Sequence, residues 1–494
     1  MITKAFKFGE FKHKVTPMEH QEKNFLATRD LEYFGNFWEM GCAKTKVMID
    51  TAAWLFLKGE IDGVLVITDK GVYRNWADYE IPIHMMEGIP ARVRVWQSTC
   101  GKKAQHEVNQ LLIAREDCLD ILIMNVEAFA HDKAPTFAQA FLDSHYGMTI
   151  IDESDSIAHA TAKRTKAILD LRDLSPYRRI LTGTPIADSP LAVYTQAEFL
   201  KPGLLGYNSF VAFRAEYAHL MLMDLGPGKK FYKITGYKNV DKLQKSMQSW
   251  SSRLLKTDCL DLPDKVYEVF HIEHTPEQAR IYNQLKEEAL TQLEAGTISS
   301  TSAMTTLTKL HQINCGHVKI DKLDTEEEGQ TVDIPSNRVA GLLALLHKVK
   351  GKVIIWACFR RDFDLIGEAL TKEFGIESWV NYYGGTEQNQ RPENVKRFKT
   401  EDSCRFFLSN PTTGGRGITL VEASYAIRYS YGWRLSPILQ SEDRNYRKGQ
   451  INSCTYVDLC TPGTIDVKIR ASHRAKRELS SSILDNLREV LQAD

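Results

Sequence analysis

The chain has 494 residues, of which 43% are hydrophobic and 26% are charged, and its 63 basic residues balance 63 acidic residues. This composition is that of a globular protein too long for a single hydrophobic core, and it excludes the fibrous and disordered classes. Because the formal net charge is zero, no global field attracts nucleic acid or membranes, and a polyanion site must be a local patch.

The first 200 residues alternate short apolar runs with longer amphipathic segments. The runs rich in Val and Ile are GVLVIT (63–68), DILIMN (120–125), MTIID (148–152) and RILTG (179–183). This rhythm is typical of parallel strands joined by crossover helices. Residues 1–200 are therefore predicted to form an N-terminal α/β lobe.

The rhythm stops near residue 200 and returns near residue 350. Residues 201–335 are predicted to form a mostly helical protrusion and linker region, in which the polar, acidic stretch 321–336 is a mobile loop or linker. Residues 336–470 are predicted to form a second α/β lobe with strands at KVIIWA (352–357), CRFFLS (404–409), YAIRYS (425–430) and CTYVDL (454–459).

Residues 471–494 are predicted to form a C-terminal helix. The helical period begins near Thr464, and five basic residues lie within the ten positions 468–477: Lys468, Arg470, Arg474, Lys476 and Arg477. Two interpretations stay open, a solvated helix face and a patch that contacts phosphates.

The stretch WEMGCAKTK (38–46) ends like a phosphate-binding loop and precedes an apolar segment of helical length. Free N–H groups at a helix N-terminus point toward a bound anion. Lys44 would neutralise the β and γ phosphates of ATP, and the Thr45 hydroxyl would bind Mg²⁺. Trp38 and Ala43 occupy the two glycine positions of the general GxxxxGK[ST] pattern, so an incidental helix N-terminus is the alternative.

A pair of carboxylates, Asp152 and Glu153, ends the apolar run MTIID. A carboxylate at the end of a buried strand is costly unless it serves a cation. Asp152 would hold Mg²⁺, and Glu153 would orient and deprotonate the attacking water. Taken alone, the pair is equally an acidic turn after a strand, but together with the loop it indicates ATP hydrolysis.

The second lobe contains QSEDRNYRKGQ (440–450), in which Arg444 and Arg447 lie three residues apart. On a helix or turn they face the same way, and both could reach the γ phosphate as arginine fingers. Catalysis would then depend on closure of the two lobes. The alternative is a pair of arginines in surface ion pairs.

These blocks, in this order, resemble the Swi/Snf-type ATPases of helicase superfamily two, which are translocases on double-stranded DNA. The resemblance covers about residues 12 to 470 and implies two RecA-like parallel-sheet lobes with helical insertions between them. The family loop reads DEMGLGKT, so Ala43 is the one substitution at a glycine that closes around phosphate. Ala43 could strain the turn if that position needs φ > 0. Asp155 replaces a family histidine, and its effect on turnover stays open.

The resemblance also implies roles for two sets of residues. Gln21 would read the adenine edge, and the nucleotide-binding set is Gln21, Gly41, Cys42, Ala43, Lys44 and Thr45. The set that couples the phosphate site to DNA or faces DNA is Thr182, Gly183, Thr184, Gly415, Gly417 and Gln440.

The function expected from these motifs is ATP- and Mg²⁺-dependent translocation on duplex DNA, through backbone contacts that carry no sequence information. Replication or recombination proteins are candidate partners. Nine cysteines without a CxxC pair favour a reducing cytoplasm over secretion, and no run of about 20 apolar residues indicates a membrane span. The compactness of the chain around the motifs of the resemblance, and not its composition, suggests a bacterial cell or a phage-infected host. The alternatives are a strand-separating DNA or RNA helicase, a nucleotide-gated DNA clamp with little turnover, and a structural protein with vestigial motifs.

Overall fold

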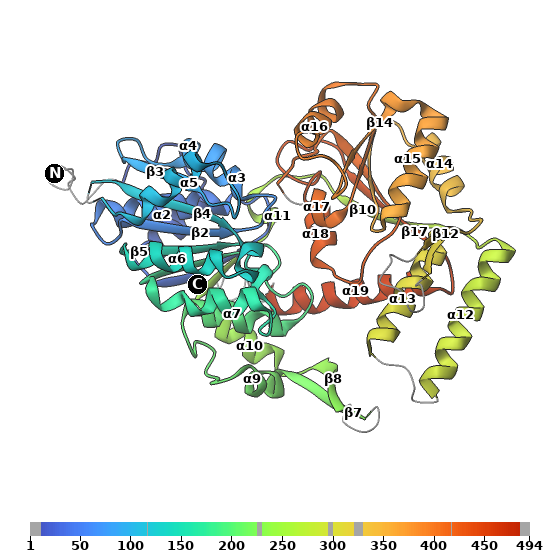
Figure 1. Ribbon diagram of the computed structural model, residues 1–494, viewed down its shortest axis with the longest axis horizontal. Coiled ribbons are helices and arrows are strands. Elements are labelled where there is room, and N and C mark those ends of the chain that lie inside the picture. Colours follow the sequence, from blue (N-terminus) through green and yellow to red (C-terminus); the bar gives the residue numbers. More distant parts are fainter. Residues whose placement is uncertain are drawn as a thin grey trace. The chain divides into compact units, whose positions relative to one another are not determined.

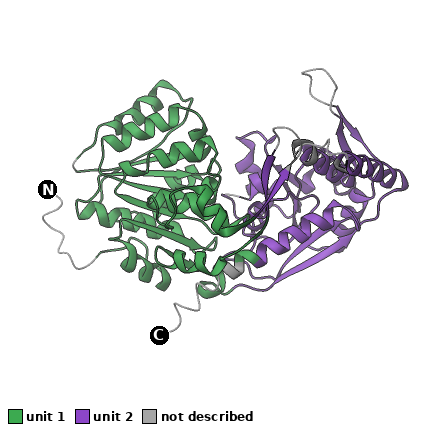
Figure 2. Cartoon of the chain, turned by 90° about the horizontal axis from the view of Figure 1, so that it is seen from below, with its two compact units in different colours: residues 1–219, 235–261, 479–494 green, residues 220–234, 262–478 purple. Residues whose placement is uncertain are grey.

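The computed structural model describes residues 11–115, 117–224, 230–294, 300–320, 330–415 and 417–484. The chain divides into two compact units, coloured separately in Figure 2. Unit 1 contains residues 1–219, 235–261 and 479–494, and unit 2 contains residues 220–234 and 262–478. Among the described helices, none combines the length and apolar content that a membrane crossing requires.

Unit 1 is built on a seven-stranded sheet in the order β3-β4-β2-β5-β6-β1-β9 (Figure 1). Every pairing is parallel. The strands are β1 (Tyr33–Trp38), β2 (Gly63–Thr68), β3 (Ala91–Val95), β4 (Leu119–Asn125), β5 (Gly147–Asp152), β6 (Tyr177–Leu181) and β9 (Ser251–Leu254). The four strands predicted from Val- and Ile-rich runs are confirmed as β2, β4, β5 and β6. The sequence did not reveal β1, β3 and β9, which lack such runs or are short and polar.

The helices of unit 1 include the one predicted after the phosphate-binding loop, α2. They are α1 (Glu19–Thr28), α2 (Lys44–Leu57), α3 (Tyr73–Asn75), α4 (Ile81–His84), α5 (Lys102–Asn109), α6 (Lys133–Asp143), α7 (Lys163–Asp170), α8 (Val193–Leu200), α9 (Phe210–Tyr217), α10 (Val240–Gln248) and α11 (Lys256–Cys259). A separate two-stranded sheet consists of β7 (Ala218–Asp224) and β8 (Lys230–Tyr237).

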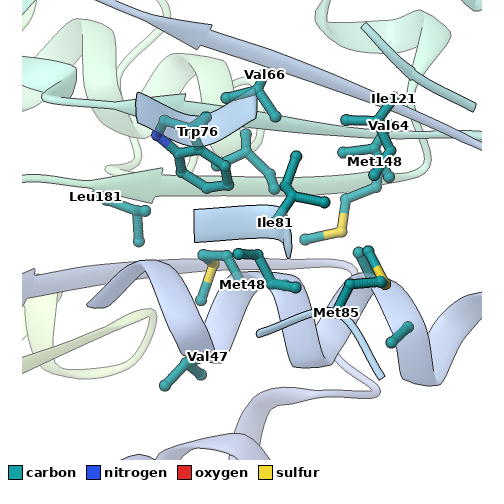
Figure 3. Close-up of a cluster of buried hydrophobic side chains, with 14 of the residues drawn as sticks. Val47, Met48, Val64, Val66, Trp76, Ile81, Met85, Ile121, Met148 and Leu181 are labelled. Carbon is teal, nitrogen blue, oxygen red and sulfur yellow. The ribbon is translucent and has the colours of Figure 1, made fainter. Parts of the chain in front are cut away.

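Helix α2 is apolar almost all round and is buried against the sheet, as expected for a helix without a polar face. Figure 3 shows Val47 and Met48 of α2 in one cluster with Val64 and Met148 of the strands. Each fully buried side chain of this size contributes about 1.5–3 kcal/mol of hydrophobic stabilisation. This packing fixes the start of α2, and with it the preceding loop, at one edge of the sheet.

Unit 2 has a six-stranded sheet, again wholly parallel, in the order β10-β17-β16-β13-β15-β14. Its strands are β10 (Lys265–His271), β13 (Lys352–Trp356), β14 (Trp379–Tyr382), β15 (Phe406–Ser409), β16 (Ala423–Arg428) and β17 (Cys454–Cys460). Its helices are α12 (Pro276–Glu294), α13 (Ser300–Asn314), α14 (Arg338–Lys348), α15 (Arg360–Phe374), α16 (Gln390–Thr400), α17 (Pro411–Gly414), α18 (Ser436–Glu442) and α19 (Ile465–Leu484). The four predicted strands are confirmed, whereas β10 and β14 were missed.

The expectation that residues 201–335 are mostly helical is wrong in part. Helices α12 and α13 are long, but β9 of this segment joins the first sheet and β10 joins the second. Each is an edge strand whose hydrogen bonds come from a partner far away in sequence, such as Lys265 opposite Cys454. Such long-range pairing leaves little local pattern in the sequence.

The stretch 321–336 also differs from the predicted loop or linker. Gln330–Asp333 forms β12, which pairs with β11 (His317–Ile320) in an antiparallel ladder. Residues 321–329 lie outside the described residues. The C-terminal helix α19 begins at Ile465, in agreement with the helical period expected from Thr464 and before the predicted domain boundary at 471. Residues 485–494 lie outside the described part.

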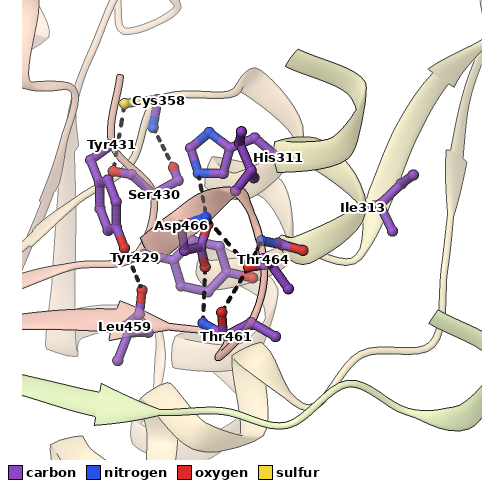
Figure 4. A network of polar contacts seen from close by, with 12 residues as sticks. His311, Ile313, Cys358, Tyr429, Ser430, Tyr431, Leu459, Thr461, Thr464 and Asp466 are labelled. Carbon is purple, nitrogen blue, oxygen red and sulfur yellow. Dashed lines mark hydrogen bonds and ion pairs between the residues drawn. The ribbon is translucent and has the colours of Figure 1, made fainter. Parts of the chain in front are cut away.

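A buried polar network ties α13, α14 and α19 to the sheet of unit 2. Figure 4 shows His311, Thr461 and Asp466 of this network. The Arg338 guanidinium donates to the Tyr429 carbonyl oxygen at 2.6 and 2.8 Å and to Asp466 at 2.8 Å. Asp466 also accepts from the Thr461 N–H at 3.1 Å, and His311 lies 3.6 Å from it. A buried polar network of this kind favours one arrangement of these elements.

Candidate nucleotide-binding site

Three strands that are neighbours in the first sheet bring the predicted catalytic residues together. In the order β5-β6-β1, Asp152 is the last residue of β5, Thr182 follows β6, and the loop of residues 39–43 follows β1. Because all three strands are parallel, their carboxyl ends lie at the same edge of the sheet, where ligands bind in open α/β folds. Residues more than 140 positions apart in sequence therefore belong to one site.

The phosphate-binding loop turns through two residues with positive φ. Gly41 has φ +89°, and Ala43 has φ +54° and ψ +47° in the left-handed region. Position 43 therefore does need φ > 0, which is the condition under which the alanine was expected to strain the turn. For an L-residue other than glycine this conformation costs on the order of 1 kcal/mol.

Two side chains of α1 hold the carbonyl groups of this loop. Gln21 donates from Nε2 to the Ala43 carbonyl at 2.9 Å, and its Oε1 accepts from the Met18 N–H at 2.8 Å. The His20 ring nitrogen Nε2 lies 3.1 Å from the Cys42 carbonyl oxygen. The residue predicted to read the adenine edge thus braces the loop in this structure, and its contact with adenine stays a prediction.

Lys44 begins α2 and points its amine back at the loop. Its Nζ donates to the carbonyl oxygens of Trp38 at 2.9 Å and Glu39 at 3.3 Å, and the side chain is buried. A buried ammonium held by neutral carbonyl groups suits a site that receives a polyanion. Thr45, in the first turn of the same helix, is partly exposed.

Asp152 is a buried carboxylate with fixed orientation. Its Oδ2 accepts from the Trp76 indole N–H at 2.8 Å, with the Thr68 hydroxyl 3.5 Å away, and its Oδ1 accepts from the Glu153 N–H at 3.1 Å. Burial raises the pKa of Asp152 above its ordinary value, and the Trp76 hydrogen bond and the Lys44 charge offset part of this rise. A nearby divalent cation would favour the charged form further.

Glu153 follows directly and is also held in the left-handed region, at φ +54° and ψ +58°. Strained backbone of this type clusters at functional sites. Its Oε2 lies 3.3 Å from the Thr182 hydroxyl, which is also 3.4 Å from Asp155 Oδ1 and accepts from the Thr184 N–H at 3.1 Å. The hydroxyl of Thr182 therefore connects the acidic turn to the turn after β6.

Arg253, which the sequence did not single out, clamps the two turns together. From β9 its guanidinium donates to the carbonyl oxygens of Phe37 at 2.8 Å and Gly183 at 3.3 Å, and it pairs with Glu39 at 3.5 Å. Gly183 packs so closely on the loop that a Cβ would lie 3.1 Å from the Met40 nitrogen. The role of Arg253 could be predicted only from the pairing of β9 with β1, which no pattern in the sequence indicates.

The donor set fits a nucleotide with Mg²⁺. The start of α2 supplies backbone N–H groups without intrahelical partners and the Lys44 amine, while Thr45 and Asp152 supply the hard oxygen ligands that Mg²⁺ prefers. Within the described residues, no group of three or more His, Cys, Asp or Glu side chains could hold a metal. Magnesium at this site would therefore depend on phosphate oxygens as well as on protein ligands.

The predicted residues of unit 2 lie around the turn that follows α18. Arg444 is buried, and it donates to the carbonyl oxygens of Gln440 at 3.0 Å and Ile418 at 3.1 Å. Arg447, in the same turn, is partly exposed. The arginines thus follow the helix rather than lie on it, and their reach toward the γ phosphate stays a prediction.

The residues assigned to coupling or DNA contact differ in exposure. Thr182, Thr184 and Gln440 are buried, which fits a role in coupling better than direct contact with DNA. At Gly415 a Cβ would lie 2.0 Å from the Pro411 carbonyl oxygen, and Gly417 has φ +76°, so both positions require glycine.

Three of the five basic residues of α19 form ion pairs within unit 2. Arg470 pairs with Asp458 at 2.8 Å, Arg474 with Glu478 at 2.9 Å, and Arg477 with the buried Glu442. Arg477 is neither part of a solvated helix face nor free to contact phosphates, because its guanidinium binds the buried carboxylate of Glu442.

Comparison with known proteins agrees with this geometry. The model of the SNF2-related domain matches residues 37–318, and the helicase conserved C-terminal domain matches residues 337–449. The chain therefore belongs to the SNF2-related ATPase family of helicase superfamily two.

Several curated proteins are similar to the chain over most of its length. The DNA repair and recombination protein RAD54-like of Gallus gallus is 25% identical over 494 residues, covering 92% of this chain and 64% of that protein. The putative ATP-dependent helicase/translocase YwqA of Bacillus subtilis is 26% identical over 344 residues, which cover 68% of this chain and 35% of that protein. The chain thus spans less than two thirds of the length of these relatives. The solved Sulfolobus solfataricus SWI2/SNF2 ATPase core in complex with dsDNA aligns with 97% of this chain and 96% of its own, at 23% identity and a TM-score of 0.42.

Replacing Ala43 with glycine is expected to stabilise unit 1 by about 1 kcal/mol, because glycine adopts positive φ without strain. The matched control is Ala104→Gly in the first turn of α5, also exposed, which should destabilise by at most about 1 kcal/mol. Thermal unfolding of both variants measures the two shifts. If both substitutions change the unfolding temperature in the same direction, the result would contradict the strained geometry of the loop.

Proposed function

We propose that this protein is an ATP- and Mg²⁺-dependent translocase that couples ATP hydrolysis to movement along duplex DNA. Such movement would remodel DNA structures or protein–DNA complexes in replication, recombination or repair. The observation that supports the proposal most is the meeting of Lys44, Asp152, Glu153 and Thr182 at one sheet edge, after the neighbouring strands β5, β6 and β1. Family membership supplies the expectation that the nucleic acid is DNA.

The residues of unit 1 have distinct parts in the proposed reaction. Lys44 leaves the carbonyl groups of the loop and binds the β and γ phosphates, while the N–H groups at the start of α2 bind the remaining oxygens. Thr45 and Asp152 would hold magnesium, which supplies charge neutralisation at the phosphate oxygens when bound. Glu153 orients the attacking water and accepts its proton, and the Thr182 hydroxyl keeps the Glu153 carboxylate in place.

The residues of unit 2 are proposed to link hydrolysis to DNA. Arg444 and Arg447 are the proposed arginine fingers, and Gly415 and Gly417 allow the backbone to approach phosphates closely. Because phosphate contacts do not read bases, binding should be independent of sequence and weaken with added salt. We place the protein in the cytoplasm of a bacterial cell or a phage-infected host, with replication or recombination proteins as partners.

Steady-state ATP hydrolysis with Mg²⁺ tests the proposal, with no nucleic acid, single-stranded DNA, duplex DNA or duplex RNA added. Duplex DNA is expected to stimulate the rate most, and removal of Mg²⁺ with a chelator should abolish it. A stronger response to duplex RNA would favour the RNA helicase alternative. Hydrolysis under none of these conditions would refute the motor.

A second candidate, a nucleotide-gated DNA clamp with little turnover, is favoured by one observation, the strained Ala43 in the loop. Strain at this turn could slow the chemical step while binding of nucleotide continues. The clamp predicts DNA affinity that changes with bound nucleotide but no release of phosphate. The motor predicts that duplex DNA accelerates phosphate release.

A further inference from the structure

Two thiols meet behind the phosphate-binding loop. The Cys42 Sγ, between Gly41 and Ala43, lies 3.3 Å from the Cys259 Sγ at the last residue of α11. Both residues belong to unit 1, and the chain enters unit 2 directly after Asp261. The contact therefore joins the nucleotide-binding loop to the last helix before the chain leaves its unit.

Helix α11 is already tied to the same loop through Glu39. The Lys256 N–H donates to Glu39 Oε2 at 2.8 Å, and the Glu39 N–H donates to the Leu254 carbonyl oxygen at 2.9 Å. The Cys42 side chain is fully buried, whereas Cys259 is partly exposed. A small reagent can therefore reach Cys259 first, and Cys42 stands in position to resolve the product.

We propose that Cys42 and Cys259 form a reversible disulfide that fixes the phosphate-binding loop to α11 and stops ATP turnover. The inference deepens the proposed function, because what the disulfide regulates is the ATP site. Formation of the disulfide itself does not depend on that function. The oxidant class is a low-molecular-weight disulfide such as oxidised glutathione.

The chemistry proceeds by two thiol–disulfide exchanges. The Cys259 thiolate attacks one sulfur of oxidised glutathione, which forms a mixed disulfide and releases one glutathione thiolate. The Cys42 thiolate then attacks the Cys259 sulfur, which forms the protein disulfide and releases the second glutathione. The protein loses two electrons and two protons, and the glutathione disulfide is reduced to two thiols. Burial raises the pKa of both thiols, Cys42 and Cys259, so each exchange is slow and the disulfide forms under sustained rather than brief oxidation.

The geometry explains why the disulfide should affect the nucleotide. The two sulfurs must approach from 3.3 Å to about 2.05 Å, so the two side chains, or the loop and α11 that carry them, have to move by about 1 Å. The Cys42 carbonyl is held by His20, and Lys44 stands two residues further along. A loop held at both its backbone and its side chain cannot adjust around phosphates as the free loop can.

The test treats the whole reduced protein with oxidised glutathione and follows three readouts: peptide mapping under non-reducing conditions, binding of labelled ADP and DNA-stimulated ATP hydrolysis. We expect a Cys42–Cys259 disulfide, at least a tenfold loss of hydrolysis, and recovery with dithiothreitol. Cys259→Ser should be insensitive. Cys100→Ser should stay sensitive, because Cys100 is also partly exposed in unit 1 but its thiol faces Gln105.

Absence of the mapped disulfide would overturn the inference, and so would a complete disulfide that leaves the rate of ATP hydrolysis unchanged. If the reduced protein hydrolyses no ATP, the proposed function fails. In that case the disulfide map and the binding of ADP decide the inference. Loss of ADP binding on oxidation supports the inference, and unchanged ADP binding overturns it.

Discussion

Replacing Glu153 with glutamine is expected to lower the rate of DNA-stimulated ATP hydrolysis by about 10²–10⁴-fold. The amide keeps the size of the side chain and can still meet the Thr182 hydroxyl, but it cannot accept a proton from water. Binding of ADP should be retained, because Lys44 and the start of α2 are unchanged. Parallel measurements of hydrolysis and ADP affinity separate the loss of the base from a loss of the fold.

Glu107→Gln is the matched control for this variant. Glu107 is a partly exposed glutamate of α5 in the same unit, where it lies 3.6 Å from Arg94, and its replacement should leave the rate unchanged. A Glu153→Gln variant that keeps more than a tenth of the wild-type rate would show that another group activates the water.

The second large effect concerns Glu442, a buried carboxylate at the end of α18. It accepts from the Tyr267 hydroxyl at 2.8 Å and from Lys265 at 3.2 Å, and Arg477 and Arg428 flank its other oxygen. Burial by itself would raise the pKa of Glu442, but the charges of Lys265, Arg477 and Arg428 outweigh it and hold this pKa well below its ordinary value. The carboxylate fixes the chain two residues before Arg444.

Glu442→Gln is expected to destabilise unit 2 by about 3–5 kcal/mol at neutral pH, because three cations lose a buried counter-charge. Since the folded pKa is depressed, the stabilisation is fully present above the unfolded glutamate pKa of about 4.3 and is lost as the pH falls below it. Calorimetric scans at several pH values should therefore show a difference in unfolding temperature between wild type and variant that becomes smaller as the pH falls below about 4.3.

If the difference in unfolding temperature between wild type and Glu442→Gln does not change with pH, the effect of the substitution comes from packing rather than from charge. The control is Glu373→Gln, because Glu373 pairs with His347 at 2.7 Å on the surface of the same unit. An exposed pair of this kind contributes about 0–1 kcal/mol.

The sequence predicted the elements whose pattern is local. Helix α2 and the eight predicted strands were visible because a largely buried element is apolar along most of its length. Strands β9 and β10 were not visible, because edge strands owe their place to partners far away in sequence. The same distinction explains why residues 201–335 were expected to be mostly helical.

The candidate site divides in the same way. Lys44, Asp152 and Glu153 stand in short motifs whose chemistry can be read in order along the chain. Trp76, Arg253 and Cys259 act on those motifs only through the fold, because each reaches the site from an element that the motifs do not contain. Position 43 is an intermediate case, since the sequence showed the alanine but only the backbone showed that it must adopt positive φ.

Displacement of a third strand from a DNA triplex measures movement along a duplex directly, because a translocase strips the third strand without separating the two strands of the duplex. With ATP and Mg²⁺ the protein is expected to release the third strand, and Glu153→Gln should release none. A forked duplex in the same reaction shows whether the strands are also separated. ATP hydrolysis stimulated by duplex DNA, without release of the third strand, would contradict the account that hydrolysis drives movement.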